Sequence, residues 1–404
     1  MLKQKLVILL GTKFNAIEIV RSLGFRVLLI SDDPKQENTP DRVYFPYEKS
    51  QKGIYDLAFF EPYVNDDLEA VIVCVEDFVE LGAQLRAKYP QIPQFGPNES
   101  QAKTLRSKVL MKSFARSVGV PTTNFVEIDE GSDFSTISSQ VGLPFLLKPK
   151  LGWLAQGIHL IANEAEWQKV LATIPEVGDY FAEEYLTSIK EYCCDTLVAD
   201  GVFVAQFAGE YSVSCLESNH KHEGIGVSFP GFLGAEAIER LKSLTRTFIE
   251  TLGVRDGFFH TEFLWTPERG WMFGEVGCRL PGGYQLPTES KVVETNLLDF
   301  YLKMFLPNFR KDTYKALPFV HPYVGYYLFP KLAGTVKSVR AENTANLPWV
   351  FEFKRYIKEG DVLDHEDSSV TMGAHVLYGA NGIEELRSRS QLIRTFFSAD
   401  YEES

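Results

Sequence analysis

Two glutamates near the middle of the chain have neighbours and spacing that suit metal chemistry. Residues 258–265 and 271–276 are aromatic-rich apolar runs, and the intervening 266–270 (TPERG) is rich in turn-forming residues, so the pattern predicts a β-hairpin. The first run carries Glu262 and the second carries Glu275. Because Mg²⁺ in proteins is bound by one or two carboxylates together with substrate phosphates, the hairpin is a candidate metal-binding element.

The length of the turn decides whether the two glutamates meet. A four-residue loop that pairs Thr266 with Trp271 places Glu262 directly opposite Glu275. In this register one face of the hairpin carries His260, Glu262, Leu264, Phe273, Glu275 and Gly277. Two like charges directly opposite each other destabilise a sheet by about 0.2–1 kcal/mol, so the pair needs a counter-charge. A bound cation supplies one; the alternative is that one glutamate faces solvent or pairs with a flanking arginine.

A lysine at the end of an apolar strand is a candidate phosphate ligand. The predicted strand 143–150 contains Lys148, and a lysine in such a run either extends to solvent or meets an anion. The following segment, 148–157, holds Gly152 and Gly157 and is not a Walker A sequence. It is either a loop that lies over phosphates or an ordinary surface loop.

Other charged residues fit either a site or a solvated surface. Lys108 lies on a helix predicted over 101–118, where a solvated face is the default interpretation. Glu183, Glu184 and Glu191 lie at strand ends, where acidic side chains are usually hydrated. Taken alone, these residues do not distinguish a binding site from a solvated surface.

A polar cluster at 217–222 (ESNHKH) precedes two glycines. Its Glu217 and His220 could belong to a metal site, but no second ligand set matches the spacing of a zinc site. A mobile polar loop is the alternative interpretation.

The elements that must hold these residues begin with an alternation of strands and helices. Apolar runs at 6–10, 26–30 and 70–75 predict buried strands, with helices at 15–23 and 80–88 between and after them. This rhythm predicts a small parallel α/β domain. The residues after the first run, GTKFNA, lack the GxGxxG pattern of a dinucleotide-binding turn.

The rest of the chain is mixed, so the predicted class is α/β, with α+β character overall. Apolar runs at 191–198 and 202–207 flank an Asp-Gly turn and predict a second hairpin. A helix is predicted over 234–252, and a unit rich in short strands over 323–404. The vicinal cysteines 193 and 194 fall in the first of these runs, so we expect them to pack on opposite faces of a strand.

The composition of the chain limits the kinds of molecule that the protein is expected to bind. With 54 acidic and 41 basic residues among 404, the net charge is −13, which argues against a nucleic-acid or anionic-membrane surface. The five cysteines show no CxxC or zinc spacing and are expected to be free thiols of a cytoplasmic protein. No apolar run approaches the roughly 20 residues of a membrane span, and the N-terminal run is too short for a secretory signal.

Taken in order, these segments resemble the ATP-grasp superfamily of carboxylate–amine ligases over roughly residues 100–300. The resemblance implies an ATP-grasp fold whose N-terminal parallel α/β (pre-ATP-grasp) domain spans 1–100. The core would span 101–310, with a lid subdomain at about 121–186, and a small β-rich α+β domain would span 311–404. It also implies ATP and Mg²⁺ (or Mn²⁺) as cofactors.

The resemblance also implies a role for each candidate residue. The nucleotide-binding residues would be Lys108, Lys148, Gly157, Glu183, Glu184, Tyr185, Leu186 and Glu191. Glu262 and Glu275 would bind the metal, and Gly277 stands where the family often has Asn, which leaves the number of metal ions open. Lys148 and Arg279 would be the catalytic residues that steady the transferring phosphoryl group.

Within the superfamily the chain is most similar to bacterial L-amino acid ligases of the bacilysin-synthesis type, which join two amino acids. The similar features are the Glu-x-x-His at Glu217 and His220, the spacing of the two metal glutamates, and Arg279 followed by Pro-Gly-Gly. By this resemblance the substrate-binding residues would be Glu217, His220, Arg279, Gly282 and Gly283. The two glycines predict a roomy pocket and a first substrate larger than alanine.

The implied reaction forms an amide or peptide bond from two small molecules. A carboxylate would attack the γ-phosphate of ATP, and an amine would displace phosphate from the resulting acyl phosphate, with release of ADP. A homodimer is compatible with the resemblance. The alternatives are an ATP-grasp enzyme with another substrate (bicarbonate, a purine precursor or a natural-product carboxylate) and a nucleotide-binding module without turnover.

Overall fold

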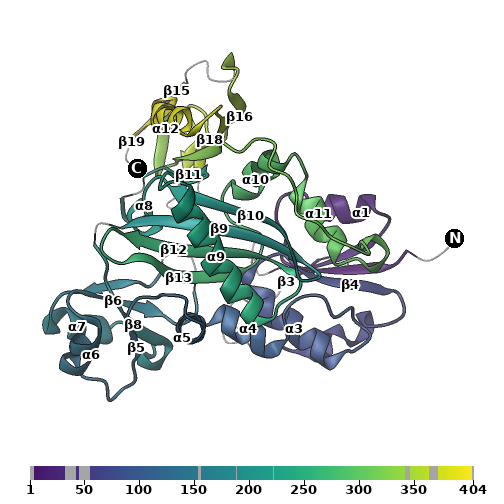
Figure 1. Ribbon diagram of the computed structural model, residues 1–404, viewed down its shortest axis with the longest axis horizontal. Coiled ribbons are helices and arrows are strands. Elements are labelled where there is room, and N and C mark those ends of the chain that lie inside the picture. Colours follow the sequence, from purple (N-terminus) through teal and green to yellow (C-terminus); the bar gives the residue numbers. More distant parts are fainter. Residues whose placement is uncertain are drawn as a thin grey trace.

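Four β-sheets and the helices packed on them make up the described part of the molecule. The computed structural model describes residues 4–31, 42–44, 55–152, 156–187, 189–221, 223–341, 346–363 and 372–402. Figure 1 shows a large antiparallel sheet across the middle, with a parallel sheet at the N-terminal side and two smaller sheets beyond the other edges. None of the described helices combines the length and the apolar character needed to cross a membrane.

The N-terminal sheet is parallel, with the order β3-β2-β1-β4. Its strands are β1 (Leu6–Leu10), β2 (Arg26–Ser31), β3 (Arg42–Tyr44) and β4 (Leu68–Val73). Alternate residues of β1 enter two different hydrophobic cores, one shared with α3 (Val79–Lys88) and the other with α1 (Ala16–Ser22) and α11 (Leu297–Met304). Both faces are therefore covered, as continuous apolar strands predict.

A separate small sheet lies over one end of the central sheet and has its own core. It is antiparallel with the order β5-β8-β6-β7, and its core includes Trp167 and Phe145 in edge-to-face contact. Its elements are β5 (Phe125–Glu127), α6 (Phe134–Val141), β6 (Phe145–Pro149), β7 (His159–Ile161), α7 (Glu164–Leu171) and β8 (Tyr180–Glu184). We call these elements the lid sheet.

The central sheet has eight strands in the order β13-β12-β9-β10-β11-β14-β18-β16. They are β9 (Lys190–Ala199), β10 (Val202–Tyr211), β11 (Ile225–Phe229), β12 (Gly257–Thr266), β13 (Gly270–Cys278), β14 (Val324–Pro330), β16 (Val350–Arg355) and β18 (Met372–Gly379). Helix α9 (Ala235–Leu252) covers one face, and α10 (Gln285–Val293) with α11 covers the other. Cys193 and Cys194 enter these two different cores, as predicted.

The last part of the chain completes the central sheet and adds a smaller one. Strands β14, β18 and β16 continue the eight-stranded sheet, and a three-stranded sheet with the order β17-β15-β19 lies beside them. Its elements are β15 (Gly334–Ala341), β17 (Val362–Leu363), α12 (Ile383–Leu392) and β19 (Phe397–Glu402). Shorter elements elsewhere are α8 (Cys215–Lys221), η1 (Leu57–Tyr63), η2 (Glu76–Phe78), η3 (Val177–Asp179), η4 (Pro307–Phe309) and η6 (Ile393–Thr395).

The single helix predicted over 101–118 is wrong, because the chain forms two helices there. Helix α4 (Glu99–Arg106) ends at Ser107, whose backbone is extended (φ −88°, ψ 115°). The same serine is the N-cap of α5 (Lys108–Ser117), since its hydroxyl accepts a hydrogen bond from the backbone of Leu110. The break places Lys108 in the first turn of a new helix.

The hairpin of β12 and β13 confirms the pairing of Glu262 with Glu275 but corrects the predicted register. Thr266 pairs with Gly270, not with Trp271, so the turn is one residue shorter than predicted. A β-bulge at Gly274 inserts one unpaired residue and restores the pairing beyond it. Phe273 consequently lies opposite Phe263 in the hydrophobic core, and not on the face that carries Glu275.

The effect of a substitution at Phe273 distinguishes the register with the bulge, which buries this side chain, from the register without it. This side chain is fully buried and stacks on Phe248 with ring centroids 5.1 Å apart. We expect Phe273→Ala to lower the free energy of unfolding by about 3–5 kcal/mol, as measured by urea denaturation, because it leaves a cavity. Leu160→Ala, at a half-exposed strand position of the lid sheet, should change it by less than about 0.5 kcal/mol. Unchanged stability of Phe273→Ala would indicate the register without the bulge.

Candidate active site

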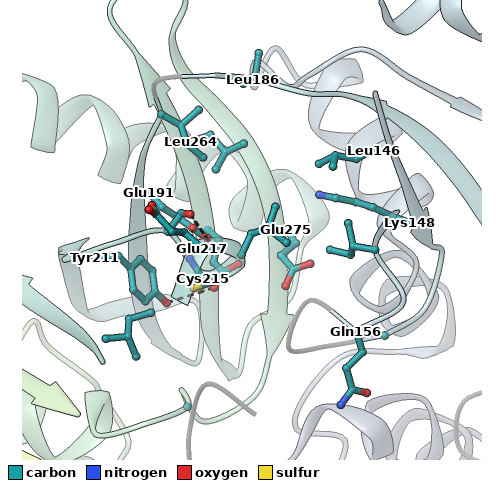
Figure 2. A pocket seen from close by; sticks show the side chains of 18 of the residues that line it. Leu146, Lys148, Gln156, Leu186, Glu191, Tyr211, Cys215, Glu217, Leu264 and Glu275 are labelled. Carbon is teal, nitrogen blue, oxygen red and sulfur yellow. Dashed lines mark hydrogen bonds between the residues drawn. The ribbon is translucent and has the colours of Figure 1, made fainter. Parts of the chain in front are cut away.

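A cavity of about 640 Å³ lies between the lid sheet and the central sheet. In Figure 2, Lys148 and Glu275 extend into it from opposite walls, and Glu191, Tyr211 and Cys215 gather on one side. Most of the predicted site residues line this cavity, namely Lys108, Lys148, Glu183, Glu184, Tyr185, Leu186, Glu191, Glu217, Glu262, Glu275, Arg279, Gly282 and Gly283.

Two predicted residues are not part of the described wall. Gly157 lies next to Pro149, and a Cβ at this position would be 3.1 Å from the proline ring. His220 lies in α8, but its side chain is outside the described part of the structure. Residues 153–155 of the predicted phosphate-covering loop also lie outside the described residues.

The two hairpin glutamates reach the cavity with different partners. Glu275 forms an ion pair with Lys108, which also donates to the carbonyl oxygen of Gly152 at 3.2 Å. Glu262 accepts on its Oε1 from the Tyr211 hydroxyl at 3.3 Å and from His260 Nε2 at 3.2 Å. Burial raises the pKa of Glu262, but His260 outweighs that effect and holds the pKa below its ordinary value.

His260 is itself held by a buried carboxylate on the neighbouring strand. Its Nδ1 lies 2.5 Å from Asp195 Oδ1, and the two residues pair directly across β9 and β12. Burial lowers the pKa of His260, but Asp195 and Glu262 outweigh that effect and raise the pKa to about 9. His260 therefore bridges the two carboxylates through its two ring nitrogens.

The predicted strand lysine, Lys148, meets an anion rather than solvent. Glu183 is almost completely buried and pairs with Lys148 at 2.9 Å and with Lys112 at 2.7 Å, and it also accepts from Thr123. Burial raises the pKa of Glu183, but the two lysines outweigh it and hold the pKa well below its ordinary value. Glu183 thus fixes Lys148 at the cavity wall.

A third carboxylate approaches the hairpin from β9. Ligand atoms of Glu191, Glu262 and Cys215 lie within 4.8 Å of one another, and Glu191 accepts from the backbone N–H of Cys215 at 2.8 Å. Burial and the neighbouring Glu262 raise the pKa of Glu191 above its ordinary value. Elsewhere on the wall, Glu184 pairs with Arg269, and Glu217 pairs with Lys221 four residues later in α8.

The inner end of the cavity is joined to the N-terminal sheet by residues that the sequence did not single out. Glu76 follows β4 and bridges Arg279 Nε at 3.1 Å and Arg106 at 2.8 Å. Lys13 follows β1 and donates to the carbonyl oxygens of Leu280 at 2.9 Å and Pro281 at 3.0 Å. Burial and the nearby Arg279 lower the pKa of Lys13 to about 7.

A signal for Glu76 and Lys13 was present in the sequence. Each lies three residues beyond the end of a buried parallel strand, Lys13 after Leu10 and Glu76 after Val73. Ligand sites of open α/β sheets lie at the carboxyl ends of their strands. Tyr211 and Cys215, which line the cavity, gave no comparable signal. Nor did Lys112 and Asp195, which contact Glu183 and His260 of its wall, because only the packing of distant strands and helices brings these residues together.

The residues present fit a magnesium nucleotide. Glu262 and Glu275 offer hard oxygen donors from adjacent strands, which is the donor type that Mg²⁺ prefers. Lys108 and Lys148 line the same cavity and add cationic groups that suit phosphate. The cavity volume is within the range of roughly 300–1,000 Å³ that is usual for small-molecule and cofactor sites.

The Glu76 bridge predicts a stability effect that depends on pH. Burial raises the pKa of Glu76, but Arg106 and Arg279 outweigh it and lower the pKa from 4.5 to about 2. The bridge therefore stabilises the folded protein fully above about pH 4.5, and this contribution is lost as the pH falls towards 2. We expect Glu76→Gln to lower the free energy of unfolding by about 3 kcal/mol at pH 7 and by progressively less below pH 4.5.

Urea denaturation at several pH values measures this difference. Glu61→Gln removes a carboxylate that pairs with Lys88 at the surface of the same unit, and it is the matched control with an expected effect below about 1 kcal/mol. A Glu76→Gln effect that is the same at pH 7 and pH 3 would contradict the ionic bridge.

Comparisons with known proteins agree with this architecture, although no family model matches the chain. An L-arginine-specific L-amino acid ligase from Bacillus subtilis is 24% identical over 346 residues, which cover 83% of this chain and 81% of that protein. The crystal structure of an L-amino acid ligase from Bacillus licheniformis has a TM-score of 0.75 at 18% identity and covers 99% of both chains.

A third similar protein is a carboxylase domain, whereas the first two proteins are L-amino acid ligases. The biotin carboxylase domain of 2-oxoglutarate carboxylase from Hydrogenobacter thermophilus, solved with magnesium ADP and bicarbonate, has a TM-score of 0.70 at 16% identity. It covers 99% of this chain and 91% of that one. At such identities the structural comparisons establish the fold, and the sequence relatives extend the similarity over most of the chain. This chain has the ATP-grasp fold and is similar in sequence to an amino acid ligase over most of its length.

Proposed function

We propose that this protein is an ATP-dependent carboxylate–amine ligase that joins two amino acids or amino-acid-like molecules. A substrate carboxylate attacks the γ-phosphate of ATP to give an acyl phosphate and ADP. An amine then attacks the acyl carbon, and phosphate leaves as the amine loses a proton. The observation that carries this proposal is that the pair Glu262 and Glu275 shares one cavity with Lys148 and Arg279.

The nucleotide is assigned to the outer part of the cavity. Lys108 and Lys148 neutralise phosphate oxygens, and Glu183 keeps Lys148 oriented. Tyr185 and Leu186, in the connection from the lid sheet to the central sheet, line the base pocket together with Glu184, and Glu191 receives the ribose hydroxyls. Mg²⁺ or Mn²⁺ bound at the two hairpin glutamates supplies charge neutralisation for the phosphates.

The acyl-donor carboxylate is assigned to the inner end, beside Arg279. Glu76 holds Nε of the guanidinium and the carbonyl oxygen of Leu280 accepts from Nη1, which leaves Nη2 to donate to an anion. A Cβ at Gly282 would meet no atom within 4 Å, so the wall beside Arg279 leaves room for a side chain. This supports a first substrate larger than alanine.

The amine is assigned to the side of the cavity formed by α8. Glu217 lines the cavity there and offers a carboxylate to an ammonium group, and His220 lies one turn further along the helix. The similarity to an enzyme described as an L-arginine-specific L-amino acid ligase supports an amino acid as one substrate.

The metal role of the hairpin predicts the effect of Glu275→Gln. The amide keeps the shape of the side chain but removes its charge, so the rate of ADP formation should fall about 100-fold or more in a coupled ADP-release assay. Glu239→Gln, on the exposed side of α9, should leave the rate unchanged. A folded Glu275→Gln protein with the wild-type rate would remove Glu275 from the metal site.

A substrate screen tests the reaction itself. With Mg·ATP, we expect ADP and phosphate to form only when an acyl donor and an amine are both present, and mass spectrometry should detect a dipeptide or related amide. Turnover that requires bicarbonate and no amino acid would favour a carboxylase. Binding of ATP with no turnover across the amino-acid panel would favour a nucleotide-binding module.

A further inference from the structure

A buried line of charged side chains runs through the central sheet and ends at Glu262. Asp195 on β9 and His260 on β12 are directly paired, and their side chains are 0% and 5% exposed. His260 then contacts Glu262, which is two residues along the same strand and on the same face. The line therefore connects the interior of the sheet to the cavity.

A fourth residue, Glu289, lies beside Asp195 at the buried end of this line. Glu289 of α10 is fully buried, and burial together with Asp195 raises the pKa of Glu289 well above its ordinary value. In its protonated form Glu289 can donate to Asp195 Oδ2, which has no other partner among the described residues. Asp195 thus remains an anion that faces His260.

Such a line of charges is a poor way to stabilise a sheet. Removing two charged groups from water costs several kcal/mol for each, and apolar residues of similar volume often stabilise a protein as well or better. Both faces of β12 otherwise meet apolar cores, with Phe258 on the face of His260 and Phe259 on the other face. The line of charges is therefore an exception within an apolar setting, and it ends at the cavity, which assigns it a role at the site.

The geometry at Glu262 shows what the line does to this carboxylate. Oε1 receives both His260 Nε2 and the Tyr211 hydroxyl, whereas no described residue binds Oε2. Two donors on one oxygen fix the rotation of the carboxylate and leave the other oxygen for a ligand. Outer partners that orient a carboxylate or histidine ligand in this way are a general feature of metal sites.

We propose that Asp195 and His260, assisted by Tyr211, are positioning residues that fix the carboxylate of Glu262 so that Oε2 is presented to a divalent cation. The proposal rests on the proposed function, because it takes Glu262 as a metal ligand. It goes beyond that function by assigning roles to side chains that touch neither nucleotide nor substrate.

Two substitutions at one position separate the two bonds of the histidine. In His260→Asn the amide nitrogen is placed like Nδ1, so the bond to Asp195 is kept and the donor to Glu262 is lost. In His260→Gln the amide nitrogen is placed like Nε2, so the donor to Glu262 is kept. Thr261→Val is the control, since its hydroxyl has no partner among the described residues.

The measurement is the dissociation constant of Mn²⁺ in the presence of saturating ADP, read from the electron paramagnetic resonance of free Mn²⁺. We expect His260→Asn to raise it about tenfold or more, His260→Gln to restore most of the affinity, and Thr261→Val to match the wild type. Urea denaturation checks that each variant is folded; if His260→Asn does not fold, Tyr211→Phe tests the same oxygen and should also weaken binding.

The outcomes separate the two proposals. If Glu262→Gln binds Mn²⁺ as tightly as the wild type, the metal assignment fails and the proposed function loses its main support. If Glu262→Gln loses the ion but folded His260→Asn binds it as tightly as the wild type or more tightly, the positioning role is overturned while the metal site stands. Equal weakening by His260→Asn and His260→Gln would also overturn it, because the donor to Glu262 would then not matter.

Discussion

The need to compensate several carboxylates in one partly buried cavity governs the structure around it. In a low-dielectric setting like charges repel strongly, so each acidic group needs a cation within contact distance. The fold supplies one for most of them: Lys108 for Glu275, His260 for Glu262, and lysines or arginines for Glu183 and Glu76. Glu191 has no cationic partner among the described residues, and its pKa is raised instead. The cavity is thus an array of ion pairs whose cationic and anionic members can both be offered to a charged ligand.

These pairs also join parts of the chain that fold on different sheets. Glu76 and Lys13 lie at the carboxyl ends of parallel strands and hold the segment that follows β13. Glu183 of the lid sheet binds Lys112 of α5, and Lys108 of the same helix binds the hairpin. Because each pair crosses between units, the positions of the lid sheet, the N-terminal sheet and the central sheet are coupled through the site that they share.

The hairpin illustrates how a correct prediction can rest on a partly wrong geometry. The turn is one residue shorter than the pattern suggested, and the bulge at Gly274 adds one residue back, so Glu262 and Glu275 still face each other. Between turn and bulge the alternation is reversed, which sends Phe273 into the core. Alternation of side chains is a local property, but a bulge is decided by packing against the sheet and α9.

The sequence by itself determined the elements and the chemical types: buried parallel strands, the two hairpins, a lysine within an apolar strand, and the paired glutamates, since these follow from local periodicity and turn residues. The family resemblance added the fold. Only the tertiary structure decided which charges meet. The contacts of Glu183, of Arg279 with Glu76, and of Asp195 with His260 join residues that are far apart along the chain. Such partners are selected by the packing of whole sheets and helices, which local patterns do not encode.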